Sequence, residues 1–305
     1  MVRQPHGGGL GAAHARRGHN TVRSSRLRGL VLETGLAVGR FETEKEFLEF
    51  FDESFPLTTA PVVREIEYET LGTDYGASSW SPAPQIDTMI EYLAIESGSS
   101  YLDIGAGTGW PGLYVAEKTG CALTMLDYPT NGLILAMERA EQDGADAMSV
   151  SGDAARMPLA SGIFDAVSHS DVMCCLSRKA EALAECRRVS SDEGAISFTV
   201  IEMTAGLPAT DLALASEAGP EFVGSEVPYL DLLEASGWRQ AEAVDLTAEM
   251  GLLAQSILAA RTKRKDRLVD LLGEEDVELS LERATKMIKA IGDGLIRRYM
   301  YLARA

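Results

Sequence analysis

The chain has 305 residues, of which 46% are hydrophobic, and a formal net charge of −18. No apolar run approaches the roughly 18 residues that a membrane-spanning helix needs, and the acidic balance disfavours nucleic acid and membrane surfaces as partners. The four cysteines (Cys121, Cys174, Cys175 and Cys186) lack Cys-x-x-Cys spacing, which favours reduced thiols in a cytoplasmic protein over a disulfide or zinc framework.

Residues 1–30 differ in charge from everything after them. They hold six arginines and no acidic residue, so the rest of the chain carries 22 basic and 46 acidic residues. Glycine, arginine and serine dominate this stretch without apolar periodicity, which is typical of a flexible basic arm. A dispensable extension, a transit peptide and a histidine-rich metal tail all fit this composition, and we favour the first.

The next segment is predicted to form a helical cap. Residues 41–55 place Phe41, Phe47, Phe51 and Phe55 at helical spacing. A linker containing DYGASSWSPAP then leads into a second predicted helix at about 83–96. We expect residues 31–82 to form an N-terminal cap or lid.

From residue 100 onward, apolar runs alternate with helical patterns. Strands are predicted at 100–104, 121–127, 147–151, 163–169, 195–202, 239–246 and 296–304. Alternating strands and helices predict an α/β fold with a mostly parallel, doubly wound sheet covered on both faces. We assign residues 83–305 to this domain.

About fifty residues separate the last two predicted strands. Helical patterns at roughly 249–272 and 276–292 fill the gap, which is too long for a simple connection. We interpret residues 247–294 as a helical insertion, and we expect this insertion to act as a lid. Its basic run RTKRKDR is interpreted as a solvated helix face in preference to a phosphate site.

The first strand runs into a glycine-rich stretch, YLDIGAGTGWPG, at residues 101–112. A strand, a glycine loop and a helix form the first turn of a doubly wound fold, where ligands bind outside the carboxyl ends of the strands. GTGWPG also matches the dinucleotide fingerprint, and Asp127 lies about twenty residues further on, as a nicotinamide site requires.

Three features favour S-adenosylmethionine over a nicotinamide dinucleotide. Asp103 precedes the glycines, where a carboxylate can orient the loop and receive a cationic amino group but would sit badly beside a pyrophosphate. After the third strand, Asp153 can accept the adenine amine, and Ala154 can offer a backbone N–H to the ring. The insertion before the last strand suggests a final antiparallel hairpin and not a second mononucleotide-binding half.

Four stretches then resemble the class I S-adenosylmethionine-dependent methyltransferases, in particular small-molecule enzymes such as the sarcosine/dimethylglycine and quinone-biosynthesis methyltransferases. They are LDIGAGTGW, LDYPTNGL, GDAARMPLASGIFDAV and AECRRVSSDEGAISFTV, within about residues 70–246. The resemblance implies a seven-stranded sheet with an antiparallel last strand. Where the family often has Q-D-A-x-x-H, this chain has SHSDVMCCL, which keeps the acid as Asp171 but replaces the histidine with Cys175.

The resemblance also implies roles for individual positions. The three glycines would lie along the cofactor with Asp103 near its methionine end, Asp127 at the ribose hydroxyls and Asp153 at the adenine amine. The predicted cofactor-binding residues are Asp103, Gly105, Ala106, Gly107, Gly109, Asp127, Tyr128, Asp153, Ala154, Tyr75, Trp80 and Ser170. Tyr75 and Trp80 precede the first strand and either fold over the cofactor or pack the linker.

His169 and Asp171 are the candidate catalytic residues. His169 is the only histidine outside the arm and falls at the end of the fourth strand, where it could act as a base; a packed strand-end histidine is the alternative. Asp171 could orient a cationic amine or the methionine part of the cofactor, or it could cap a helix near Val172. Methyl transfer depends mainly on alignment and requires no metal.

These features together predict an S-adenosylmethionine-dependent methyltransferase with a small-molecule acceptor. Nucleic acid and membrane are not expected as partners, and the chain is expected to be a monomer or homodimer. A nicotinamide-dependent oxidoreductase and a non-catalytic S-adenosylmethionine-binding module remain the alternatives. The adjacent thiols of Cys174 and Cys175 also raise the idea of a trivalent arsenical substrate.

Overall fold

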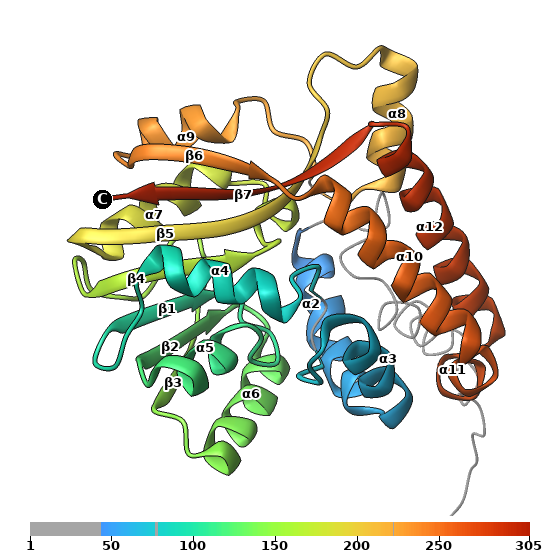
Figure 1. The fold of residues 1–305 in the computed structure, drawn as a ribbon, viewed down its shortest axis with the longest axis horizontal. Helices are drawn as coiled ribbons and strands as arrows, with labels where there is room; N and C mark the ends of the chain where they lie inside the picture. Colours follow the sequence, from blue (N-terminus) through green and yellow to red (C-terminus); the bar gives the residue numbers. More distant parts are fainter. Residues whose placement is uncertain (1–43, 77–78, 222) are drawn as a thin grey trace, which may run out of the picture.

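A computed structural model describes residues 44–76, 79–221 and 223–305 of the chain (Figure 1). The basic arm at 1–30, and Phe41 of the predicted cap helix, lie outside these described residues. Within them, no helix is both long enough and apolar enough to span a membrane.

The centre of the fold is a seven-stranded sheet in the order β3-β2-β1-β4-β5-β7-β6. β1 to β5 are parallel, whereas β7 lies between β5 and β6 and is antiparallel to both. This confirms the predicted fold class. The strands are β1 (Ser100–Ile104), β2 (Ala122–Asp127), β3 (Ala147–Ser151), β4 (Phe164–Ser170), β5 (Ser190–Met203), β6 (Arg239–Asp245) and β7 (Ile296–Arg304).

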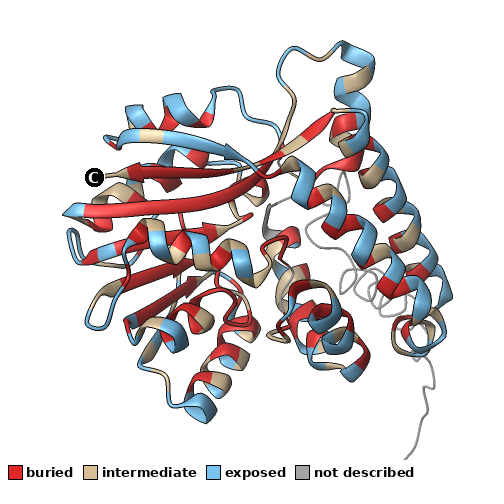
Figure 2. Cartoon of the chain, viewed as in Figure 1, coloured by how far each residue is buried: buried red, intermediate tan, exposed pale blue. Residues whose placement is uncertain are grey.

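Two hydrophobic clusters cover the two faces of the sheet, as the strongly buried central strands in Figure 2 show. One face packs against α4 (Ala83–Leu93), α5 (Gly112–Thr119) and α6 (Thr130–Asp143). The other packs against α7 (Lys179–Val189) and α9 (Tyr229–Ala235), with α8 (Ala209–Ala218) and a short 3₁₀ turn η3 (Met173–Cys175) at its end. The central strands β1 and β2 are buried on both faces, whereas β3, at the edge of the sheet, is largely exposed.

The cap helices and the insertion share a third, smaller core. α2 (Glu44–Ser54) and the 3₁₀ helix η2 (Phe55–Thr59) lead into α3 (Pro61–Leu71). Val62 and Ile66 of α3 pack with Ala260, Leu268 and Val277 of the insertion. Segments separated by about two hundred residues therefore lie side by side, and Figure 1 shows the insertion helices beside α3 at the same end of the sheet.

The insertion contains three helices and not the two that its periodicity predicts. They are α10 (Thr247–Lys263), α11 (Lys265–Leu272) and α12 (Glu274–Gly292). Arg264, with φ −112° and ψ 19°, leaves the helical conformation and divides the predicted 249–272 segment.

The basic run of the insertion is not simply solvated. Arg264 and Arg267 both donate to Glu65 of α3, and Arg264 and Lys263 both donate to Glu69. The run therefore connects the insertion to the cap by ion pairs. Periodicity within one segment could not reveal this, because the acidic partners are in another part of the chain.

Candidate active site

A cavity of about 420 Å³ opens at the carboxyl ends of β1, β2 and β4, where the strand order reverses. This is the position at which doubly wound sheets bind ligands. Ten predicted site residues line it: Trp80, Gly105, Ala106, Gly107, Asp127, Tyr128, Asp153, Ala154, Ser170 and Asp171. The structure thus brings together residues that are spread over ninety positions of the sequence.

The glycine loop lets the backbone form one wall of the cavity. Gly105 and Gly107 have φ of +68° and +50°, a region that glycine adopts without steric cost. A Cβ on Gly105 would overlap the Val172 side chain, and a Cβ on Gly107 would lie 3.3 Å from Phe55 Cε1. Both positions therefore need glycine for conformation, and Gly105 needs it for space as well.

Asp127 holds this loop from the end of β2. Its carboxylate accepts hydrogen bonds from the backbone N–H of Gly107 at 2.7 Å and of Tyr128 at 2.8 Å. Burial raises its pKa from 3.8 to about 6, and the two backbone donors oppose that rise. The side chain remains partly accessible on the cavity wall, where unused acceptor positions can receive hydroxyl donors.

Asp153 follows β3 and already has two partners. One carboxylate oxygen accepts the Ala155 N–H at 2.8 Å, and the other forms a close ion pair with Arg178, which also lines the cavity. The Arg178 and Asp153 side chains are 46% and 31% exposed, so solvent weakens this ion pair. A ligand amine that approaches Asp153 would share it with Arg178.

Asp171 is bound to a buried arginine. Arg298 of β7 is completely buried and contacts both carboxylate oxygens of Asp171 at 2.9 Å. The same guanidinium donates to the Ser81 hydroxyl at 2.6 Å and to the Gln85 side-chain oxygen at 3.0 Å. All three of its nitrogen atoms therefore donate hydrogen bonds. Asp171 lines the cavity as a neutralised ion pair and not as the acceptor for a cationic amine that its sequence position suggested.

The 79–85 segment is fixed by the same network. Ser81 is within 3.3 Å of the Ser170 hydroxyl, and its carbonyl oxygen accepts the indole N–H of Trp110 at 3.1 Å. Trp80, next to it in the chain, is 4% exposed and lines the cavity. Arg298 therefore helps to hold Trp80 on the cavity wall.

Three predicted cofactor residues do not line the cavity. Asp103 is buried behind the loop, where it accepts the Gly112 N–H at 2.9 Å, and burial raises its pKa to about 7. It orients the loop but does not face the cavity, because its side chain points into the packing of α5. Gly109 likewise contacts α5 and α6, since a Cβ there would meet Leu113 and Ala136.

Tyr75 is the third. Its ring packs 5.4 Å from that of Trp110, and the Arg139 guanidinium lies 4.5 Å from its centroid. Tyr75 lines a separate pocket with Asp74 and Arg139. Of the two predicted aromatic residues, Trp80 alone lines the cavity.

The structure does not place His169 on the cavity wall, where its predicted role as a base would require it. Its ring is 1% exposed, stacks on Phe198 at 4.5 Å and does not line the cavity. Neither ring nitrogen has a hydrogen-bond partner among the described residues. Burial lowers its pKa to about 3, so it is neutral at physiological pH. Strand alternation directs its side chain away from Ser168 and Ser170, into the aromatic core.

Helix α2 covers the cavity with aromatic side chains. Phe47, Leu48 and Phe51 line it from α2, and Phe55 does so from η2. Asp52 anchors this helix, because its carboxylate accepts the backbone N–H of Asn131 in α6 at 2.7 Å. The predicted cap therefore contributes directly to the cavity wall.

Sequence reasoning missed several of these residues. Arg298, Ser81, Gln85 and Arg178 gave no motif. One signal for Arg298 was available in the sequence. Strand alternation places Arg298 on the same face as the apolar residues Met300 and Leu302. Because a buried arginine rarely lacks an acidic partner, this position indicated an ion pair.

Part of this chain matches a methyltransferase family, and similar proteins include methyltransferases. Residues 102–198, from β1 into β5, match a family described as "Methyltransferase domain". The methyltransferase GfsG of Streptomyces halstedii is 24% identical over 77% of this chain and 86% of its own length. The (+)-O-methylkolavelool synthase of Herpetosiphon aurantiacus is 24% identical over 71% of this chain and 77% of its own length.

Solved structures share the fold. Phosphoethanolamine N-methyltransferase 2 of Haemonchus contortus, in complex with phosphomonomethylethanolamine and S-adenosylhomocysteine, has a TM-score of 0.71 at 15% identity over 86% of this chain. This chain spans 60% of that protein. The [4+2]-cyclase SpnF has a TM-score of 0.69 at 20% identity and covers 88% of this chain and 98% of its own. At sequence identities of 15% and 20%, the similarity of these structures to this chain establishes the fold alone.

Proposed function

We propose that this chain, a class I S-adenosylmethionine-dependent methyltransferase that acts on a small molecule, holds its methyl donor between the glycine loop and the carboxylates of Asp127 and Asp153. The observation that carries this proposal is the single cavity wall that the loop and these two residues form at the switch point of the sheet. The residues fit the cofactor, because a Cβ at Gly105 or Gly107 would crowd this wall.

Asp127 would bind the ribose hydroxyls. Its carboxylate is already oriented by two backbone N–H groups, and an ionised carboxylate has further acceptor positions. Asp153 and the backbone of Ala154 would bind the adenine ring, with Arg178 giving up part of its contact to Asp153. Tyr128, Ala106, Trp80 and Ser170 would complete the enclosure.

The chain accelerates the reaction mainly by alignment. Bound S-adenosylmethionine supplies an electrophilic methyl group on a sulfonium, and the protein must bring a nucleophile into line with it. α2 and Trp80 line the cavity with apolar side chains, and the Arg298–Asp171 pair fixes the segment that carries Trp80. His169 is buried beside Phe198, so it takes no part in this proposal as a base.

We further propose that residues 31–82 and the insertion at about 247–294 act together as a cap on the 83–305 domain. The shared core of α3 with α10 to α12, and the ion pairs to Glu65 and Glu69, support this division.

Calorimetric titration with S-adenosylhomocysteine and, in parallel, with NADH tests the cofactor assignment. Saturable binding of S-adenosylhomocysteine alone is expected; binding of NADH alone, or of neither compound, would contradict it. Asp127→Ala should weaken the binding of S-adenosylhomocysteine about tenfold or more, since a hydrogen bond to a charged group contributes about 1.5–3 kcal/mol. Asp146→Ala, at an exposed carboxylate before β3, is the matched control.

A further inference from the structure

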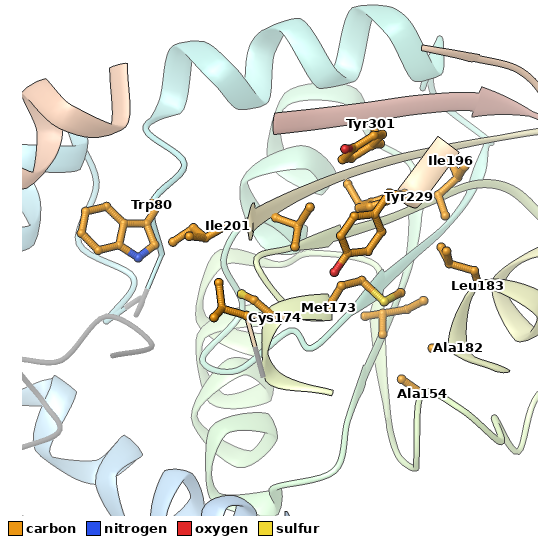
Figure 3. Close-up of a cluster of buried hydrophobic side chains, with 14 of the residues drawn as sticks. Trp80, Ala154, Met173, Cys174, Ala182, Leu183, Ile196, Ile201, Tyr229 and Tyr301 are labelled. Carbon is orange, nitrogen blue, oxygen red and sulfur yellow. The ribbon is translucent and has the colours of Figure 1, made fainter. Parts of the chain in front are cut away.

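The cavity has a second, apolar wall that shares only Trp80 with the residues proposed to enclose the cofactor. We call it the acceptor wall, and it consists of Phe47, Phe51, Trp80, Leu176, Ile201 and Pro220. These residues come from the cap, the segment before α4, the end of η3, the end of β5 and the loop after α8. Figure 3 shows Trp80, Ile201 and Cys174 at one end of the buried hydrophobic cluster, where that cluster borders the cavity.

Each charged side chain on the described cavity lining already has a partner. Asp127 accepts two backbone N–H groups, Asp153 pairs with Arg178, and Asp171 pairs with Arg298. The Asp171–Arg298 pair is almost completely buried, with the Arg298 and Asp171 side chains 0% and 7% exposed.

The other polar groups that line the cavity beside this wall are uncharged; the Lys179 ammonium donates to the Leu176 carbonyl oxygen at 2.7 Å but does not line the cavity. Cys174 and Cys175 both direct their thiols to the Asp171 carbonyl oxygen, at 3.1 Å and 3.6 Å. The neighbouring Cys174 thiol, together with burial, raises the pKa of Cys175 well above its usual value, so this thiol stays protonated. The six residues of the acceptor wall therefore carry no charge, and the one cation on the described cavity lining, Arg178, pairs with Asp153.

From this distribution of charge we propose that the methyl acceptor is an uncharged, largely apolar small molecule bound against the acceptor wall. This inference rests on the proposed function for the identity of the cavity. A charged acceptor would lose its hydration here without gaining a counter-charge. An uncharged apolar one would exchange water for aromatic and aliphatic surface, which is favourable in proportion to the area buried.

Three probes of one chain length and different charge test this proposal. The full chain, saturated with S-adenosylhomocysteine at pH 7, is titrated calorimetrically with 1-octanol, octylammonium and octanoate. We expect 1-octanol to bind at least tenfold more tightly than either ion. Equal or tighter binding of an ion, or no binding of 1-octanol, would overturn the inference.

A variant pair locates the binding site. Phe51→Ala removes a ring from the acceptor wall and should weaken 1-octanol binding at least threefold, and by a larger factor than it weakens S-adenosylhomocysteine binding. Leu252→Ala, at a side chain 69% exposed on α10, should change neither. An equal effect of both variants would place the alcohol outside the cavity and contradict the proposal.

The two proposals fail separately. If S-adenosylhomocysteine does not bind, the cofactor assignment is wrong, and the three probes are titrated against the protein alone, where the same order of affinity is expected. If S-adenosylhomocysteine binds but octylammonium or octanoate equals 1-octanol, the cofactor assignment stands and the acceptor class is wrong.

Discussion

Arg298 contacts both carboxylate oxygens of Asp171 at 2.9 Å across 127 residues of sequence. The arginine is completely buried, and the aspartate adopts a left-handed conformation with φ 56° at the end of β4. The last strand of the sheet thereby fixes a turn on the wall of the cavity.

The first prediction concerns this ion pair. Arg298→Met should lower the free energy of unfolding by about 3–5 kcal/mol, because it leaves the Asp171 carboxylate buried without a cation. Asp171→Asn combined with Arg298→Met should recover at least half of that loss, because no unpaired charge then remains. Urea denaturation of the three proteins measures this, and a double variant as unstable as the single one would show that charge burial is not the cause.

The second prediction is a pH dependence of cofactor binding. Burial raises the pKa of Asp127 to about 6, and hydroxyl donors bind its ionised form. The affinity for S-adenosylhomocysteine should therefore change little above pH 7 and fall about tenfold between pH 7 and pH 5. Titrations at several pH values measure this slope.

Asp127→Asn serves as the control for that slope. Since the variant has no titrating group at this position, its weaker binding should change much less between pH 7 and 5. Any pH dependence of binding that remains in this variant would be due to Asp103. Burial raises the pKa of Asp103 to about 7. A flat wild-type profile would contradict the assignment of Asp127 to the ribose.

The third prediction concerns His169. Its pKa is lowered to about 3 in the folded protein and is near 6.5 in the unfolded chain, so acid favours unfolding as soon as the pH falls below about 6.5. Between pH 7.5 and 5 this one group should cost the wild type about 2 kcal/mol. His169→Leu should lose that much less stability over the same range.

The comparison isolates the histidine, because the titrating carboxylates are present in both proteins. Urea unfolding at the two pH values gives the double difference directly. The variant should also keep its affinity for S-adenosylhomocysteine, since His169 does not line the cavity. A large loss of affinity with unchanged stability would return His169 to the site.

The fourth prediction separates backbone strain from lost space at two glycines. Gly72 has φ +80°, and a Cβ at this residue would have nothing within 4 Å, so Gly72→Ala should cost only about 1–2 kcal/mol of left-handed strain. Gly105→Ala adds an overlap with Val172 and should cost about 1–3 kcal/mol more. It should also weaken cofactor binding, which Gly72→Ala should not. Equal stability of the two variants in thermal unfolding would contradict the steric argument.

The sequence predicted the sheet well and the site in part, for one physical reason. Local patterns report which residues form a strand and which loop follows it, so β1, β3 and β7 were placed at their observed bounds. Parallel strands then bring their carboxyl ends together, which is why Gly105, Asp127 and Asp153 meet at one cavity.

The errors arose where a side chain had a choice of direction or partner. His169 lies at a carboxyl strand end, yet alternation turns it into the aromatic core beside Phe198. Asp171 was predicted as a carboxylate available to a ligand, because nothing near it in sequence indicated Arg298. The division of the insertion at Arg264 was likewise missed, since its ion pairs are with α3.

The position of β7 between β5 and β6 also bears on the synthesis of the protein. β6 is made first, but it pairs only with β7 within the described part of the sheet. Until residues 296–304 have left the ribosome, a nascent chain has no partner for β6 and no cation for Asp171. The methyl-donor cavity should therefore reach its final structure only late in translation. Arrested chains that end before β7 already contain every glycine and carboxylate proposed to hold the cofactor. We nevertheless expect such chains not to bind S-adenosylhomocysteine.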